Sequence, residues 1–197
     1  MSPDDARRAS AIRSPKAADD WRVSRALLHA MRTAVPPPGA TSLSHSGGHA
    51  VGAAAPAGWK VGVDLERIRP RDVERLAQWV CAASEREALA KLEGAARLDH
   101  FYMLWTLKEA FIKAAGLDFP ADMASVGLES APGGQQLRAP PGAWRACSYR
   151  LGADWMASVA WLEPAAGPAG PIRPQWRGAA ACPLPTLAVL GQWQAGI

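Results

Sequence analysis

The stretch FYMLWTLKEAFIKAAG, residues 101–116, decides the fold class, because it predicts a long helix with charged residues among aromatic and aliphatic ones. Trp105, Glu109 and Lys113 recur at every fourth residue and therefore share one face of that helix. The simplest interpretation is a solvent-exposed Glu–Lys pair, which stabilises a helix by only about 0.2–0.5 kcal/mol. The alternative is a functional face, and the rest of the chain has to decide between the two.

The composition is that of a globular protein with its own core. The chain has 197 residues and is 49% hydrophobic, which allows one domain or two small ones. Its three cysteines, Cys81, Cys147 and Cys182, are odd in number and far apart, which favours free thiols and a cytoplasmic location over a disulfide framework or a zinc site. Residues 1–10 lack the apolar run of a signal peptide.

The charge balance mildly favours anionic partners. The net charge is +4 and the isoelectric point is near 9.3. Nucleic-acid binding usually requires a denser basic stripe, and no apolar run reaches the length of a membrane span. We therefore expect neither nucleic acid nor a membrane as a partner.

Periodicity and turn residues predict an arrangement of helices and short strands. A helix over residues 19–34 precedes two short strands that flank the turn HSGG at 45–48. A strand is predicted from Lys60 to about Leu65, and Ser84 is predicted to cap a helix that stops at Gly94. The long helix is expected over 97–115, and further strands at 124–130, 143–151 and 154–163. Residues 163–197 are rich in Pro and Gly, which predicts a loosely structured extension, part of which packs on the body.

Two acidic residues follow an apolar approach at the predicted strand end. Asp64 and Glu66 are two residues apart, so in a strand they project from the same face. Adjacent carboxylates repel each other unless a cation lies between them, which suits a hard metal ion. The alternative is an exposed strand end with two solvated acids.

A turn of small and polar residues precedes this strand. Ser44, His45 and Ser46 are followed by two glycines, and such a turn can direct N–H, hydroxyl and imidazole groups at an anion. The alternative is an ordinary hairpin loop, and His49 is expected to be a hairpin side chain. If the long helix brings Glu109 to Asp64 and Glu66, three carboxylates surround a Mg²⁺ site, with Lys113 facing the phosphates of a substrate.

The order of SLSHS (42–46), VGVDLE (61–66) and FYMLWTLKEAFIKAAG (101–116) resembles the Sfp-type 4′-phosphopantetheinyl transferases, and WRVSRALLH (21–29) resembles their N-terminal helix. The resemblance implies an α+β fold with a pseudo-two-fold pair of similar halves, each a small antiparallel sheet packed with a long helix. It divides the chain into an N-terminal half at 1–57, a C-terminal half at 58–162 and an extension at 163–197. The N-terminal half is short for the family and lacks its G-K-P segment.

The resemblance also implies an activity: Mg²⁺-dependent transfer of the phosphopantetheine arm of coenzyme A to a serine of an acyl or peptidyl carrier protein, as in holo-(acyl-carrier-protein) synthases. Adenosine 3′,5′-bisphosphate is released. Asp64, Glu66 and Glu109 match the metal-binding acids. Glu109 also matches a residue that helps to deprotonate the serine, and Lys113 matches the catalytic lysine beside the diphosphate.

Other positions match the coenzyme A contacts of the family. Ser44 and His45 match residues that contact its phosphates, and Arg8 and Arg25 lie in the region that supplies basic contacts to the 3′-phosphate. Lys108 belongs to the helix motif without an assigned role. Two alternatives stay open: a decayed relative that binds coenzyme A or a carrier protein without transfer, and a Mg²⁺-dependent phosphohydrolase.

The segment RIRPR follows the acidic pair directly. Arg67, Arg69 and Arg71 alternate with Ile68 and Pro70, so an extended chain presents the three arginines on one face. We expect this strip to dock an acidic carrier protein, and the alternative is a solvated charge run.

Overall fold

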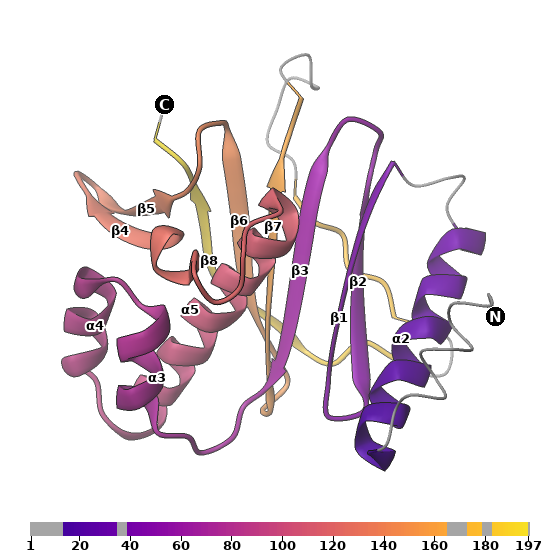
Figure 1. Cartoon of the computed structure of the whole chain (residues 1–197), viewed down its shortest axis with the longest axis horizontal. Coiled ribbons are helices and arrows are strands. Elements are labelled where there is room, and N and C mark those ends of the chain that lie inside the picture. Colours follow the sequence, from indigo (N-terminus) through magenta and orange to yellow (C-terminus); the bar gives the residue numbers. More distant parts are fainter. Residues whose placement is uncertain (1–13, 35–38, 165–172, 179–182, 197) are drawn as a thin grey trace.

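The computed structural model describes residues 14–34, 39–164, 173–178 and 183–196. A smaller N-terminal part, formed by helix α2 (Pro15–Ala34) and the hairpin of β1 (Ala40–Ser46) and β2 (His49–Ala55), lies beside a larger C-terminal part (Figure 1). The remaining elements are β3 (Lys60–Arg67), α3 (Val73–Val80), α4 (Ala83–Ala90), α5 (Gly94–Ala115), the 3-10 turn η1 (Met123–Ser125), β4 (Gly127–Ala131), β5 (Gly134–Arg138), β6 (Trp144–Leu151), β7 (Trp155–Leu162) and β8 (Leu187–Gln194). The expected α+β class is confirmed.

The N-terminal part is a helix packed on a two-stranded hairpin. Ser46 pairs with His49, so only Gly47 and Gly48 form the turn, and both have the positive φ that a tight type I′ turn requires. Residues 44–46, expected in the turn, therefore belong to β1. Helix α2 approaches β2 so closely that a Cβ on Gly52 would lie 2.2 Å from the Met31 sulfur.

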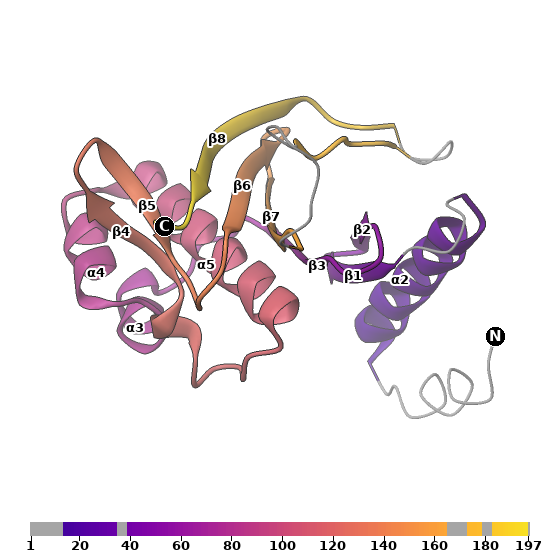
Figure 2. The ribbon, with the colours of Figure 1, turned by 90° about the horizontal axis from the view of Figure 1, so that it is seen from above.

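The C-terminal part is an antiparallel sheet in the order β3–β7–β6–β8, with α5 against one face (Figure 2). Gly62 allows the closest contact, because a Cβ there would lie 2.0 Å from the backbone oxygen of Ala110 in α5. The helix buries Phe101, Leu107 and Phe111 in a core that it shares with the sheet and with α3. This contact positions the charged face of α5 next to β3.

The opposite face of the sheet carries a second apolar cluster. Leu65 and Trp161 are buried there, and the cluster is covered by Val51 of the hairpin together with Trp176 and Leu187. The expectation that part of the C-terminal extension packs on the body is borne out, since residues 187–194 form β8 and pair with β6, although no strand was predicted there. The strand was missed because the surrounding Pro and Gly residues obscure its short apolar run.

The helix boundaries around α4 also differ from the expectation. The helix begins at Ala83, so Ser84 lies inside it instead of capping it, and the carboxylate of Glu85 accepts the N–H of Ala82 at 2.8 Å. Gly94 starts α5 instead of ending α4. The predicted end of α5 is correct, because Gly116 adopts the left-handed conformation after Ala115.

Candidate active site

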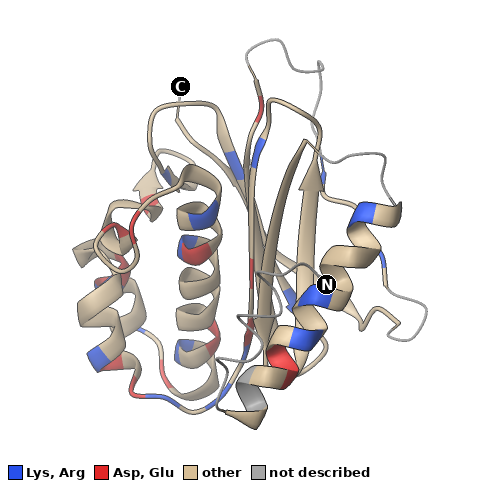
Figure 3. Ribbon diagram, turned by 45° about the vertical axis from the view of Figure 1, so that its right-hand side comes forward, with Lys and Arg blue, Asp and Glu red and all other residues tan. Residues whose placement is uncertain are grey.

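Most of the predicted site residues meet where β1, β3 and α5 lie side by side. Because Gly62 faces α5, Asp64 and Glu66 project to the same side of β3. Acidic positions mark this strand between α5 on one side and the β1–β2 hairpin with α2 on the other (Figure 3). The alternative of two solvated acids at an exposed strand end is wrong, because Asp64 is only 4% exposed.

Asp64 is the centre of this arrangement. Its Oδ1 accepts a hydrogen bond from Ser44 Oγ and an ion-paired hydrogen bond from Lys113 Nζ, each at 2.7 Å. Its Oδ2 is buried and has no hydrogen-bond partner among the described residues. One carboxylate oxygen is thus occupied, and the other remains an acceptor without a donor.

Lys113 connects α5 to β3. Its ammonium lies 2.7 Å from Asp64 Oδ1 and 3.3 Å from the backbone oxygen of Val63, and its side chain remains 30% exposed. Within the described part of the chain it forms no ion pair with Glu109. The interpretation of Glu109 and Lys113 as an ordinary surface pair is therefore wrong.

The other two carboxylates are partly buried and electrostatically linked to Asp64. Burial raises the pKa of the Glu66 carboxyl, the charge of Asp64 raises it further, and a 3.0 Å hydrogen bond from Ser46 opposes the shift. Burial and the charge of Asp64 also raise the pKa of Glu109, against the charge of Lys113. The ionised forms repel each other, and a cation or a proton would relieve that repulsion.

The predicted coenzyme A contacts do not all reach this point. Ser44 does, but its neighbour His45 is exposed on the opposite face of β1. Arg25 lies on α2 and is partly buried, whereas Arg8 is outside the described residues. The roles of these residues remain predictions.

Lys108 lies away from this face, in the interior. Its side chain is fully buried and its ammonium is 2.8 Å from Glu85 Oε2, with further hydrogen bonds to the backbone oxygens of Met123 and Val126. Glu85 also contacts Arg138 at 3.1 Å. The motif lysine therefore joins α5 to α4 and to the segment before β4.

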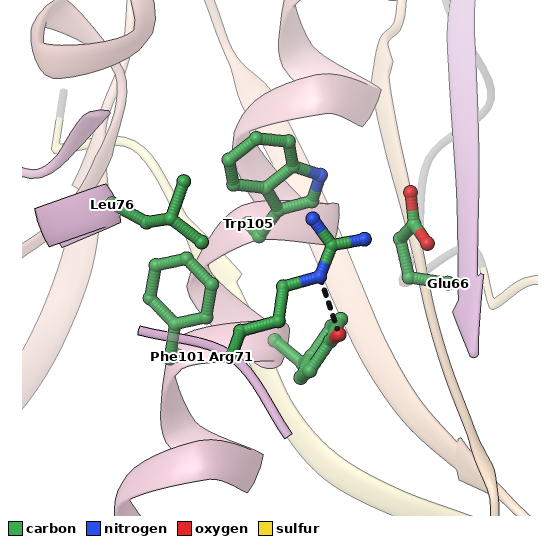
Figure 4. Close-up of a pocket in the computed structure, with 6 residues that line it drawn as sticks. Glu66, Arg71, Leu76, Phe101 and Trp105 are labelled. Carbon is green, nitrogen blue, oxygen red and sulfur yellow. Dashed lines mark hydrogen bonds between the residues drawn. The ribbon is translucent and has the colours of Figure 1, made fainter. Parts of the chain in front are cut away.

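The three arginines after the acidic pair do not form one strip. Arg67 and Arg69 lie beside Gly47, but Arg71 turns toward α5, where its Nε donates to the hydroxyl of Tyr102 at 3.1 Å. Figure 4 shows the Arg71 guanidinium between Trp105 and Glu66, in a small pocket that Tyr102 also lines. The expectation of a common face is wrong for Arg71, because β3 ends at Arg67 and the Arg71 side chain is held by Tyr102 of α5.

Sequence reasoning missed Tyr102 and the contact of Ser46 with Glu66. The Tyr102 hydroxyl accepts the N–H of Arg69 and donates to its backbone oxygen, each at 3.2 Å. No local pattern marks that tyrosine. The alternation of serines at 42, 44 and 46 was visible in the sequence, but only the structure places them opposite Asp64 and Glu66.

Comparison with known protein families gives a match over residues 60–160, which contain β3, α5 and most of the sheet. These residues match the family model of the 4′-phosphopantetheinyl transferase superfamily and make up half of the chain. The chain belongs to this superfamily. The matched segment includes Asp64, Glu66, Glu109 and Lys113, whereas Ser44 and His45 precede it.

Individual superfamily members are similar to parts of this chain. The 4′-phosphopantetheinyl transferase psf-1 of Bacillus pumilus is 32% identical over 128 residues, which cover 64% of this chain and 54% of the relative. The 4′-phosphopantetheinyl transferase Sfp of Bacillus subtilis strain 168 is 36% identical over 70 residues, covering 34% of this chain and 31% of the relative. The chain therefore matches about half, or less, of the length of these relatives.

A solved superfamily structure gives a weaker match. A holo-(acyl-carrier-protein) synthase from Bacillus anthracis, in complex with CoA (3′,5′-ADP), aligns with a TM-score of 0.45 and 15% identity. The alignment covers 52% of this chain and 94% of the other.

The superfamily resemblance implies a metal ion, and the donor atoms of the residues present determine whether they could hold it. The candidate ligands are hard carboxylate oxygens, and Asp64 Oδ2 is a buried acceptor without a partner. The described residues contain no cluster of three His, Cys, Asp or Glu side chains close enough to enclose a metal ion. Mg²⁺ usually keeps several waters and is held by one or two carboxylates plus substrate phosphates, so the donor set fits an open site of this kind.

Proposed function

We propose that this protein transfers the 4′-phosphopantetheine arm of coenzyme A to a serine of an acyl or peptidyl carrier protein and releases adenosine 3′,5′-bisphosphate, in a Mg²⁺-dependent reaction. The observation that carries the proposal is the contact of Ser44 and Lys113 with Asp64. It joins hydroxyl, ammonium and carboxylate groups from three elements at one point. Glu66 and Glu109 lie within electrostatic range of that point.

The reaction needs a base and charge stabilisation, and no covalent enzyme intermediate. The serine oxygen bonds to the β-phosphorus of coenzyme A, the bond from this phosphorus to the bridging oxygen breaks, and the bisphosphate leaves with that electron pair. Glu109 accepts the serine proton. The raised pKa of Glu109 suits this role, because a general base works best when its pKa approaches the working pH.

Lys113 provides the positive charge that the phosphoryl oxygens require as the bond breaks. Its partly exposed side chain can contact a phosphate while Asp64 orients it. One or two of the carboxylates of Asp64, Glu66 and Glu109 would hold Mg²⁺ together with the substrate phosphates, and the ion would supply Lewis-acid stabilisation of the diphosphate. Ser44, His45, Arg8 and Arg25 would contribute to coenzyme A binding.

We infer that the carrier protein approaches past Arg69 and Arg71. Neither arginine forms an ion pair with another described residue; Arg71 shares a pocket with Glu66, and Arg69 lies beside Gly47 at the turn of the hairpin. An acidic carrier surface would complement them, and such charges act mainly on the encounter rate. No described helix is long and apolar enough to cross a membrane. The described cysteines, Cys81 and Cys147, are buried free thiols, which suits our proposal of a cytoplasmic enzyme.

Intact-mass spectrometry of an apo carrier protein tests the proposal. After incubation with coenzyme A, Mg²⁺ and this protein, the carrier should gain the mass of one phosphopantetheine group, and Asp64→Asn should abolish the gain. Consumption of coenzyme A without a mass change would indicate a phosphohydrolase. Binding without either change would indicate a decayed relative, and both of these results would overturn the proposal.

A further inference from the structure

Three serines of β1 form a row of contacts with β3, although the two strands belong to different sheets. Ser42 Oγ accepts the N–H of Val63 at 3.1 Å, Ser44 Oγ donates to Asp64 at 2.7 Å, and Ser46 Oγ donates to Glu66 Oε2 at 3.0 Å. Because every second residue of a strand faces the same side, the three hydroxyls point to β3 together. Side-chain hydroxyls thus replace the backbone pairing that would otherwise join the hairpin to the sheet.

The hydroxyl of Ser46 is directed by two contacts. It accepts the N–H of Arg67 at 3.3 Å, and its single proton is given to Glu66 Oε2. A serine hydroxyl has one proton and two lone pairs, so the backbone contact leaves the proton for the carboxylate. Ser46 is thereby tied to the backbone on one side and to a site carboxylate on the other.

The position of the Glu66 carboxylate depends on this hydrogen bond more than the position of an exposed glutamate would. Its carboxylate is partly buried, and the neighbouring charge of Asp64 repels it. The described residues offer it no ion pair, since Arg71 lies in the same pocket but beyond ion-pair distance. A flexible carboxylate under repulsion moves away from its neighbour unless a donor holds one of its oxygens.

We propose that Ser46 is a positioning residue that fixes the carboxylate of Glu66 for cation binding, so that the N-terminal hairpin builds the acidic site as well as lying beside it. The proposal rests on the proposed function, because it assumes that Glu66 belongs to a cation site. Groups that hold a metal ligand through a hydrogen bond commonly change metal affinity by about 10–100-fold when they are removed.

Mn²⁺ binding to the full chain, without coenzyme A or carrier, tests the proposal directly by electron paramagnetic resonance. Ser46→Ala should weaken Mn²⁺ binding by about tenfold, the lower end of the effect of outer contacts on a metal site. Ser46→Thr keeps the hydroxyl and should restore the affinity. Ser42→Ala is the matched control: it removes a contact of the same row, but one made to a backbone N–H, and should leave Mn²⁺ affinity unchanged.

The transfer reaction supplies a second measurement. Ser46→Ala should raise the Mg²⁺ concentration required for half-maximal rate, while the KM for coenzyme A at saturating Mg²⁺ stays close to that of the unchanged protein. Unaltered Mn²⁺ affinity in Ser46→Ala would overturn the inference, as would equal losses in Ser46→Ala and Ser42→Ala. If the unchanged protein binds no Mn²⁺, the metal part of the proposed function is wrong as well. If it binds Mn²⁺ and Ser46→Ala binds it equally well, only the role of Ser46 is wrong.

Discussion

Replacing Lys108 with methionine tests the assignment of this motif residue to the interior. Methionine keeps the length and the apolar stem of the side chain but removes the ammonium. The change eliminates the 2.8 Å ion pair with Glu85 and the hydrogen bonds to the backbone oxygens of Met123 and Val126. All three partners lie around a side chain with no exposed surface.

The size of the loss in unfolding free energy depends on the contacts that Glu85 keeps after the substitution. Removing one member of a buried ion pair costs about 3–5 kcal/mol, because the other charge stays buried. Glu85 keeps Arg138 at 3.1 Å and the N–H groups of Ala82 and Leu128 at 2.8 and 3.0 Å, which places the expected loss near the lower end, at about 3 kcal/mol. For a protein of this size that loss corresponds to a fall in Tm of about 6–12 °C.

Urea unfolding followed by tryptophan fluorescence measures the free energy of unfolding, and calorimetry measures Tm. Lys91→Met is the control, because Lys91 is exposed directly after α4, and a surface change of this kind usually stays within about 0.5 kcal/mol. If Lys108→Met unfolds like the unchanged protein but loses transfer activity, the buried structural role is wrong and Lys108 acts on the substrate.

Three further predictions address the site and the fold. Burial and Asp64 raise the pKa of Glu109 above its unfolded value, so its contribution to stability is present at low pH and lost as pH rises through the folded pKa. Glu109→Gln should therefore raise Tm in metal-free buffer near pH 7 but not near pH 4, and a lower Tm at neutral pH would contradict the raised pKa. The same change should reduce kcat about a hundredfold or more. Gly62→Ala places a Cβ 2.0 Å from the Ala110 oxygen, so circular dichroism should show a largely unfolded protein, and a native Tm would refute the close packing of α5 on β3. His45→Ala should raise the KM for coenzyme A without altering Tm, because His45 is exposed, and an unchanged KM would remove His45 from the binding site.

The types of element and the face that each candidate site residue occupies could be predicted from the sequence, because these signals are local. Spacing of four placed Glu109 and Lys113 on one helix face, and spacing of two placed Asp64 and Glu66 on one strand face. The end of α5 at Gly116 followed from the need for a left-handed residue there. The order of the three motifs led to the superfamily, which residues 60–160 confirm.

Tertiary structure alone decided which atoms these residues contact. Lys113 pairs with Asp64 of β3 instead of Glu109 of its own helix, because the close contact at Gly62 brings the two elements together. Lys108 is one residue before Glu109 but lies in the interior, because neighbouring helix positions are rotated by about 100° and face different surroundings. The strand β8 and the contact of Ser46 with Glu66 likewise depend on partners far along the chain, and no local period of the sequence records such distances.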